Sequence, residues 1–259
     1  MNESQILSRE EALRAWFTRN ADPVLAEVDG LDIGWGGVQR WATAHMPIST
    51  SRQHLDLACG YGTFLAQLGW RFPDVGLIGL NIDFAGPHAS IRALLVQACV
   101  QASLVQADAR QMPFLDSTFT SASCFLGLQD IEIGFGQAGV RSALTEAVRI
   151  LQTNGTLTLL DEFSFKQFDS LLTGLPIVIL DKAERTLDVR WDRQVAERAI
   201  DFYAEGWVAQ ARLISSDERQ LLYTETHVRM KARMEQQLNI QGYFVPFGPV
   251  RKIVLGKNI

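Results

Sequence analysis

The stretch from residue 54 to residue 83 constrains the fold of this chain more than any other. It begins with a short apolar run, His54–Leu57, breaks at Gly60 and Gly62, and continues with helical spacing of apolar residues. Glycines at such a turn permit positive φ and leave no Cβ, so the helix N-terminus behind them can face a ligand closely. A second apolar run ends in polar residues at 81–83, roughly twenty positions later, where this type of sheet places a ribose-binding residue.

The same alternation continues through the segment 53–161. Short apolar runs alternate with segments of helical spacing, which is the pattern of parallel βαβ units. The pattern predicts strands at 53–58, 76–81, 103–106, 119–126 and 155–161, and helices at 62–71, 86–101 and 139–152. Asn154 and Gly155 predict a helix C-cap and a turn before the last strand. The expected fold is α/β, with a doubly wound, mainly parallel, Rossmann-like sheet and helices on both faces.

Further segments flank this core. Ser8–Glu11 has the pattern of a helix cap with its capping-box acid, Gly30–Gly37 is a glycine-rich connection, and 38–45 has helical spacing up to Pro47. These pieces predict an N-terminal helical prelude. After Phe165 the chain becomes rich in charged and amide residues with interleaved aromatic ones, so most of it is expected to form a helical lid inserted after the fifth strand.

The C-terminal part, 242–255, is apolar around Pro246, Gly248 and Pro249, which predicts two short strands that complete the edge of the sheet. The chain is therefore expected to divide into a helical prelude at 1–50, a cofactor-binding core at 51–165, a lid or substrate insertion at 166–240 and C-terminal strands at 241–259.

Composition narrows the class of partner. The net charge of −5 gives no excess of positive charge for binding a nucleic-acid backbone, so a small-molecule ligand is expected. Cys59, Cys99 and Cys124 are odd in number and lack paired or metal-like spacing, which indicates reduced thiols and no metal site. The N-terminus is polar and acidic, and the longest apolar stretch, 171–180, falls well short of the ~20 residues of a membrane span. A soluble, cytoplasmic protein is expected, and the sequence is compatible with a homodimer.

The run Asp56–Gly62 resembles the first motif of class I S-adenosylmethionine-dependent methyltransferases, in the form found among small-molecule members such as the ubiquinone/menaquinone C-methyltransferase-like group. Further motifs of that family follow in the same order and spacing, at 79–83, 107–119 and 146–155. The resemblance spans about 53–162 and covers neither the prelude nor the lid.

The resemblance implies S-adenosylmethionine as cofactor and assigns roles to particular residues. Asp56 faces the cofactor ammonium, directly or through water, while the backbone from Gly60 to Gly62 runs beside the amino-acid portion. Asp108 accepts from the adenine amino group, and the Ala109 N–H donates to a ring nitrogen. The other residues that the resemblance places beside the cofactor are Ala58, Asn81, Ile82, Asp83 and Phe125.

Asn81 departs from the family pattern, which usually has a carboxylate there to accept from both ribose hydroxyls. An asparagine accepts from one hydroxyl and lacks the charge-assisted strength, so weaker cofactor binding is expected. Asp83 points the same way only if the strand has already ended.

The implied reaction is transfer of the sulfonium methyl group to an O, N or C nucleophile of a small molecule, in the class EC 2.1.1. An in-line displacement needs mainly alignment and exclusion of water, so dedicated catalytic groups are expected to be few. The lid aromatics indicate an apolar or aromatic acceptor. Candidate general bases at strand ends or in the lid are Asp130, Glu162, His227 and Tyr203, with Gln129 and Asp161 beside the first two.

Other interpretations stay open. The chain is alternatively a non-catalytic S-adenosylmethionine-binding protein or, less favoured, an NAD-dependent oxidoreductase, whose fingerprint needs a third glycine where Leu65 stands. A base-targeting nucleic-acid methyltransferase is disfavoured because Phe125–Asp130 contains no Asn-Pro-Pro-Tyr-type signature. Cys59 is expected to be a small packing residue, and His88 a structural or exposed one.

Overall fold

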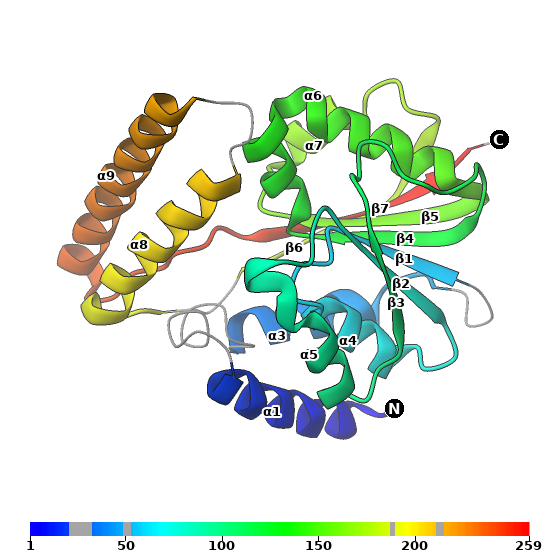
Figure 1. Cartoon of the computed structure of the whole chain (residues 1–259), viewed down its shortest axis with the longest axis horizontal. Helices are drawn as coiled ribbons and strands as arrows, with labels where there is room; N and C mark the ends of the chain where they lie inside the picture. The colour runs from blue at the N-terminus through cyan, green and yellow to red at the C-terminus, as the bar shows by residue number, and fades with distance from the viewer. Residues whose placement is uncertain (21–32, 49–52, 187–189, 211–214, 259) are drawn as a thin grey trace.

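A computed structural model of the chain describes residues 1–20, 33–48, 53–186, 190–210 and 215–258. Among these residues it contains a seven-stranded sheet in the order β3-β2-β1-β4-β5-β7-β6 (Figure 1). The parallel strands are β1 (Gln53–Leu57), β2 (Gly76–Asn81), β3 (Ala102–Gln106), β4 (Phe119–Phe125) and β5 (Leu151–Asp161). The antiparallel strands are β6 (Ile177–Arg185) and β7 (Val250–Lys257).

Helices cover both faces of the sheet. Figure 1 shows one group below the strands, namely α1 (Glu3–Asn20), α3 (Ile33–Ala44), α4 (Thr63–Arg71), η1 (Gly86–Ser90) and α5 (Ile91–Gln97). The opposite face carries α6 (Gly127–Ile150) and α7 (Phe165–Leu172). At one side of the sheet, α8 (Arg193–Gln210) and α9 (Ser216–Gln241) form a pair. None of the helices within the described residues is long and apolar enough to cross a bilayer.

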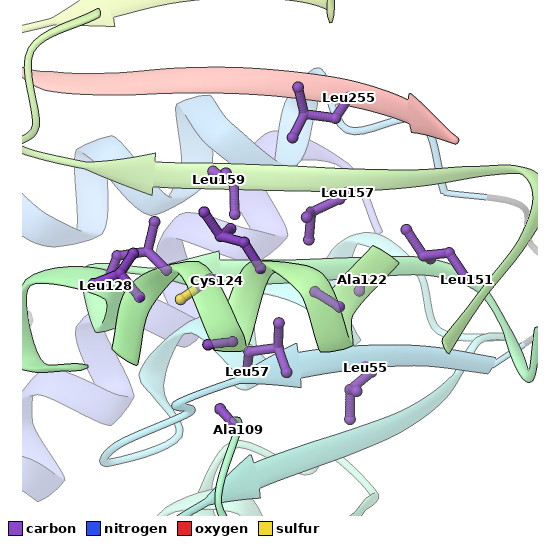
Figure 2. Close-up of a cluster of buried hydrophobic side chains, with 14 of the residues drawn as sticks. Leu55, Leu57, Ala109, Ala122, Cys124, Leu128, Leu151, Leu157, Leu159 and Leu255 are labelled. Atoms are coloured by element: carbon purple, nitrogen blue, oxygen red, sulfur yellow. The ribbon is translucent and has the colours of Figure 1, made fainter. Parts of the chain in front are cut away.

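The two faces of the sheet differ in chemistry because side chains alternate along each strand. One face is apolar, and Figure 2 shows it beneath α6 with Leu57, Cys124 and Leu159 among the labelled side chains. On the opposite face, β1 and β4 carry buried polar side chains, listed here in chain order: His54, Asp56, Ser121 and Ser123. This face therefore needs internal hydrogen bonds where the other needs only packing.

The predicted core is confirmed. All five predicted parallel strands are present, and the three predicted helices correspond to α4, to η1 with α5, and to the C-terminal half of α6. Gly136 interrupts α6 with φ 64° and ψ −176°. The helix C-cap predicted at Asn154 and Gly155 is wrong, because α6 ends at Ile150 and β5 begins at Leu151. Asn154, with φ 62°, lies instead at the register shift between β4 and β5. A Cβ on Gly155 would lie 2.8 Å from the Gln152 carbonyl oxygen, so this tight backbone requires glycine.

The start of the chain differs from the prediction. Helix α1 begins at Glu3, and Ser8 lies inside it. The cap is formed earlier: the Gln5 N–H donates to Asn2 Oδ1 at 3.0 Å, and the Asn2 N–H donates to Gln5 Oε1 at 3.0 Å. This reciprocal pair caps the helix at Asn2, whereas the Ser8–Glu11 pattern predicted the cap at Ser8. Of the predicted connection at 30–37, residues from Ile33 onward are helical, and the remainder lies outside the described residues.

The segment expected to be a helical lid contains a strand. β6 pairs with β7 from Ile177↔Lys257 to Arg185↔Val250, and it forms the edge of the sheet. Charged residues at 181–185 obscured this strand in the sequence, although charge is a common feature of exposed edge strands.

The C-terminal prediction of two edge strands is also wrong. Among the described residues, the segment 242–255 holds one strand, β7, which lies inside the sheet between β5 and β6. Before it, Phe244 makes only an isolated bridge with Trp191. Pro246 and Pro249 have no N–H to donate to a ladder, so this stretch cannot form a regular strand.

A buried carboxylate joins the three helices α1, α3 and α4. Glu10 is 2% exposed and accepts hydrogen bonds from the side chains of Arg40 on α3 and Gln67 on α4. Burial raises the pKa of Glu10, while the Arg40 charge lowers it. The three side chains hold the N-terminal helix against the helix that follows the glycine turn.

Replacing Glu10 with alanine is expected to destabilise the fold by roughly 1–3 kcal/mol, because Arg40 and Gln67 lose a buried charged partner. Urea unfolding followed by circular dichroism measures the change. Glu11→Ala is the matched control, since Glu11 is the exposed neighbour on the same helix. Equal midpoints for the two variants would contradict a structural role for Glu10.

Candidate active site

The carboxyl ends of the parallel strands bring the predicted cofactor residues to one edge of the sheet. Asp56 lies near the end of β1, Asn81 is the last residue of β2, Asp108 follows β3, and Phe125 is the last residue of β4. Parallel strands end at the same side, so residues far apart in sequence meet there.

The turn after β1 has an unusual backbone. Ala58, Gly60 and Gly62 all have positive φ, at 52°, 50° and 83°. A Cβ on Gly62 would lie 2.8 Å from Ile91 Cγ1, so glycine is required there for conformation and for space. Gly62 is the N-cap of α4, and no side chain caps that helix. The first N–H groups of α4 are therefore not taken by a capping side chain at this turn.

Gly127, which sequence reasoning missed, makes room for this turn. It is the first residue of α6, and a Cβ on it would lie 2.5 Å from Ala58 Cβ. Ala58 has a left-handed backbone conformation that residues with a side chain rarely adopt. Ala58 and Gly127 must therefore fit closely against each other. The only signal in the sequence is a glycine directly after the fourth strand.

A chain of buried hydrogen bonds runs across β1 and β4 to Asp56. His54 Nδ1 lies 2.9 Å from Ser121 Oγ, and His54 Nε2 lies 2.9 Å from Ser123 Oγ. The Ser123 hydroxyl donates to Asp56 Oδ1 at 2.7 Å. Because that hydroxyl has one hydrogen, Ser123 Oγ accepts from His54 Nε2–H, and Ser121 donates to Nδ1. Burial lowers the pKa of His54 to about 3, in keeping with a neutral ring.

Asp56 retains one unsatisfied oxygen. Its Oδ2 atom is buried and accepts no hydrogen bond from the described residues. Burial raises the pKa of Asp56 to about 7, against the lowering effect of the Ser123 hydrogen bond. Buried acceptors are nearly always satisfied, and strongly perturbed carboxylates cluster at functional sites. The second oxygen of Asp56 is thus suited to a cationic or hydrogen-bonding ligand.

At the end of β2, Asn81 contacts a histidine. Asn81 Nδ2 donates to the Asp83 carbonyl oxygen at 2.7 Å and to His88 Nδ1 at 3.1 Å. Strand β2 ends at Asn81, so Asp83 lies beyond it, with Oδ1 3.7 Å from His88 Nδ1. Tyr61 from the glycine turn packs edge-on against the His88 ring at 5.2 Å. His88, expected to be structural or exposed, therefore belongs to the surroundings of the predicted ribose-binding residue.

Asp108 is engaged within its own loop. Both carboxylate oxygens accept from the Arg110 guanidinium, including 2.6 Å from Nη2 to Oδ2. The guanidinium also lies 3.4 Å from the centroid of the Phe135 ring on α6. The predicted adenine contact of Asp108 stays a prediction, and any such contact shares this carboxylate with Arg110.

The family-like motif at 146–155 has a structural role in this loop. Glu146 Oε2 on α6 accepts from the Met112 N–H at 2.8 Å, and Arg149 donates to the Phe114 carbonyl oxygen at 2.8 Å. Arg149 also pairs with Glu146 and with Asp116. These contacts tie the loop after Asp108 to α6.

Two of the predicted bases lie at the strand ends. Asp130 is in the first turn of α6, and Glu162 directly follows β5. Glu162 Oε1 accepts from the Gly248 N–H at 2.8 Å, and burial raises the pKa of Glu162. The adjacent Asp161 instead accepts from the N–H groups of Leu128 and Gln129, so it caps α6.

The remaining predicted catalytic residues are not brought to this edge by any described contact. His227 on α9 lies 2.9 Å from Asp201 Oδ1 on α8 and stacks on Tyr223 at 5.8 Å. In Figure 1, α9 lies on the far side of α8 from the sheet. The side chain of Tyr203 lies outside the described residues. Burial raises the pKa of Cys59, which disfavours a reactive thiolate in the turn.

The ionisation of Asp56 predicts how stability depends on pH. Its pKa rises from 3.8 to about 7 on folding, so the unfolded chain loses a proton that the folded chain keeps between these values. Stability contributed by this group therefore falls as pH rises from about 4 to about 7 and stays lower above that, by roughly 4 kcal/mol.

Asp56→Asn is expected to remove this pH-dependent loss. Urea midpoints of the variant should exceed those of the wild type at pH 8 and differ less at pH 5, with the exposed carboxylate variant Asp74→Asn as control. A constant difference between pH 5 and pH 8 would contradict the assignment of a buried, titrating Asp56.

Comparison with known proteins gives a family match over the segment that contains Asp56, Asn81 and Asp108. Residues 55–155 match the model of a family described as a methyltransferase domain. A demethylmenaquinone methyltransferase from Deinococcus radiodurans is 28% identical over 137 residues, which cover 51% of this chain and 51% of that protein. The match thus spans about half the length of the curated relative.

Solved structures share the fold. A candidate sarcosine dimethylglycine methyltransferase from Galdieria sulphuraria superposes with a TM-score of 0.57 at 13% identity, over 96% of this chain and 98% of that one. A geranyl diphosphate C-methyltransferase from Streptomyces coelicolor gives a TM-score of 0.53 at 10% identity, over 90% and 83%. The cyclase SpnF gives 0.57 at 13%, over 89% and 82%.

At these identities the structural likeness establishes the fold and not the reaction. The family match, the strand order and the glycine turn agree with one another. Residues 55–155 of this chain match a methyltransferase domain family, and the chain has the Rossmann-like fold of solved methyltransferases.

Proposed function

We propose that this chain transfers a methyl group from S-adenosylmethionine to a nucleophilic atom of a small molecule. The observation that carries the proposal is the buried, unsatisfied Oδ2 of Asp56 beside the glycine turn. A cationic amino group is the partner that such an oxygen lacks, and the amino-acid end of the cofactor supplies one. When bound, the cofactor supplies an electrophilic methyl group on a sulfonium centre.

The residues around Asp56 fit the other parts of this cofactor. The backbone of the turn at 60–62 and the N-terminus of α4, which no side chain caps, suit the amino-acid portion. Asn81 Oδ1 suits a ribose hydroxyl, and Asp108 with the Ala109 N–H suits the adenine edge. Ile82 and Phe125 are the neighbouring residues at the ends of β2 and β4 that complete the proposed site.

Aromatic residues near the strand ends support an apolar or aromatic acceptor. The rings of Phe64 and Phe125 stack at 4.9 Å, and Trp191, Phe244 and Phe247 belong to the same apolar cluster. Two of the named proteins also act on molecules with an apolar body: the curated relative on demethylmenaquinone and a structural neighbour on geranyl diphosphate, whereas the Galdieria neighbour is named for the polar sarcosine and dimethylglycine. An acceptor with an apolar body is therefore the favoured class.

Among the candidate bases, Glu162 is the one we favour. It lies directly after β5, is half-buried, and uses only Oε1 for the hydrogen bond to Gly248 among the described residues. Its raised pKa brings it nearer to the range in which a carboxylate accepts a proton efficiently. Asp130 is the alternative at the same edge. A phenol or a carbon acid needs such a base, whereas an unprotonated amine does not.

A second candidate function is cofactor binding without methyl transfer. The replacement of a carboxylate by Asn81 favours it, since a neutral acceptor binds the ribose less strongly. The presence of a cyclase among proteins of this fold illustrates that the fold does not fix the reaction. An NAD-dependent oxidoreductase has less support, because a diphosphate site leaves the buried Asp56 oxygen without a partner.

Titration calorimetry tests the cofactor. S-Adenosylmethionine and S-adenosylhomocysteine are expected to bind with micromolar Kd. Asp108→Ala is expected to raise the Kd of both ligands about tenfold or more, because a charged hydrogen bond is lost. Asp116→Ala is the matched control, because Asp116 lies in the same loop and also pairs with an arginine. Binding of NAD alone, or of no ligand, would refute the methyltransferase proposal.

Methyl transfer tests the base. With an acceptor identified by release of S-adenosylhomocysteine from a panel of phenols and quinols, Glu162→Gln is expected to lower kcat by a factor of about 10² or more. The Kd for S-adenosylhomocysteine should not change. If Asp130→Asn lowers kcat and Glu162→Gln does not, the base is Asp130.

A further inference from the structure

Asn81 is fixed in one of its two amide orientations. Its Nδ2 group has two hydrogens, and both have acceptors: the Asp83 carbonyl oxygen at 2.7 Å and His88 Nδ1 at 3.1 Å. Turning the amide over would place Oδ1 against a carbonyl oxygen that cannot donate. Oδ1 therefore faces away from both acceptors, and no described residue donates to it.

His88 is itself held in place. It lies in η1, immediately after Pro87, and packs edge-on against Tyr61 of the glycine turn at 5.2 Å. To accept from Asn81, Nδ1 must be unprotonated, so the ring hydrogen is on Nε2. Burial lowers the pKa of His88, whereas the nearby Asp83 raises it. The ring thus links the backbone turn after β1 to the last side chain of β2.

We propose that His88 is a positioning residue for the cofactor: with the Asp83 carbonyl, it holds the Asn81 amide so that Oδ1 accepts from one ribose hydroxyl. The inference rests on the function proposed above. It adds that the ribose is recognised through a single neutral acceptor whose direction is set by a histidine. The chain should therefore depend strongly on one of the two hydroxyls and weakly on the other.

The same contacts predict the effect of a carboxylate at position 81, where the family pattern usually has one. An aspartate at position 81 would place an oxygen against the Asp83 carbonyl and against the lone pair of His88 Nδ1, at the distances where Nδ2 now donates. The contact with the Asp83 carbonyl oxygen would become repulsive, and the contact with His88 would be favourable only after the ring moved its hydrogen from Nε2 to Nδ1. Asn81→Asp is therefore expected to weaken binding at pH 8 instead of restoring the charge-assisted hydrogen bond.

Calorimetry with S-adenosylhomocysteine and its 2′-deoxy and 3′-deoxy analogues tests the proposal. In the wild type, removing the hydroxyl that Asn81 binds is expected to weaken binding roughly five- to tenfold, as for one neutral hydrogen bond, and removing the other much less. His88→Ala should raise the Kd for S-adenosylhomocysteine by a similar factor. It should also abolish the difference in Kd between the two deoxy analogues.

Two further variants separate positioning from folding. His88→Asn should restore the difference between the analogues, because the asparagine carbonyl oxygen can take the place of Nδ1 as acceptor. His45→Ala is the matched control, since His45 is an exposed histidine with a local hydrogen bond to the Trp41 carbonyl oxygen. Circular dichroism melting confirms that each variant is folded.

The outcomes distinguish this inference from the function on which it rests. A wild-type protein that does not bind S-adenosylhomocysteine refutes both. Wild-type binding with unchanged analogue discrimination in His88→Ala refutes the role of His88 alone, as does tighter binding by Asn81→Asp at pH 8. Collapse of the discrimination in His88→Ala, with recovery in His88→Asn, supports it.

Discussion

The burial of one carboxylate beneath a glycine turn is the constraint on which the rest of the site depends. Asp56 is almost completely inaccessible, and an ionised group there is unfavourable unless it has partners. The protein provides one partner through Ser123, which is linked through His54 to Ser121. Each member has one direction of donation, so these hydrogen bonds fix the tautomer of His54 and leave Asp56 Oδ2 without a partner among the described residues.

Because of this requirement, the two faces of the sheet are stabilised in different ways. The face beneath α6 is packed with aliphatic side chains, as Figure 2 shows, and its burial supplies cohesion without directional contacts. The opposite face combines apolar packing with buried polar groups, and the helices over it do the same: Glu10, Arg40 and Gln67 form a second buried network there. The candidate site residue Asp56 therefore lies on the face whose burial is the more costly.

Local patterns in the sequence were enough for the core of the fold. The apolar period and the glycines locate all five parallel strands and the turn, because these features depend on residues close together in the chain. Strand β6 was missed because its charged residues at 181–185 lack the apolar pattern of the other strands, and only its pairing with β7 identifies it. The cap of α1 was misplaced because two cap patterns lie six residues apart, and only the structure shows which one forms.

The site shows the same limit. Asp56, Asn81 and Asp108 were predicted from motifs, whereas His88, Gly127 and Arg110 were not. Gly127 acts through a contact with Ala58 far away in the sequence, and His88 and Arg110 act through side-chain contacts that no motif encodes. These contacts also distinguish the ends of the proposed cofactor site. Asp56 Oδ2 and Asn81 Oδ1 each leave a directed oxygen for a ligand, but both oxygens of Asp108 are held by Arg110. Adenine bound there as proposed would require Arg110 to share that carboxylate, so the proposed amino-acid and ribose ends of the site are preorganised and the proposed adenine end is not.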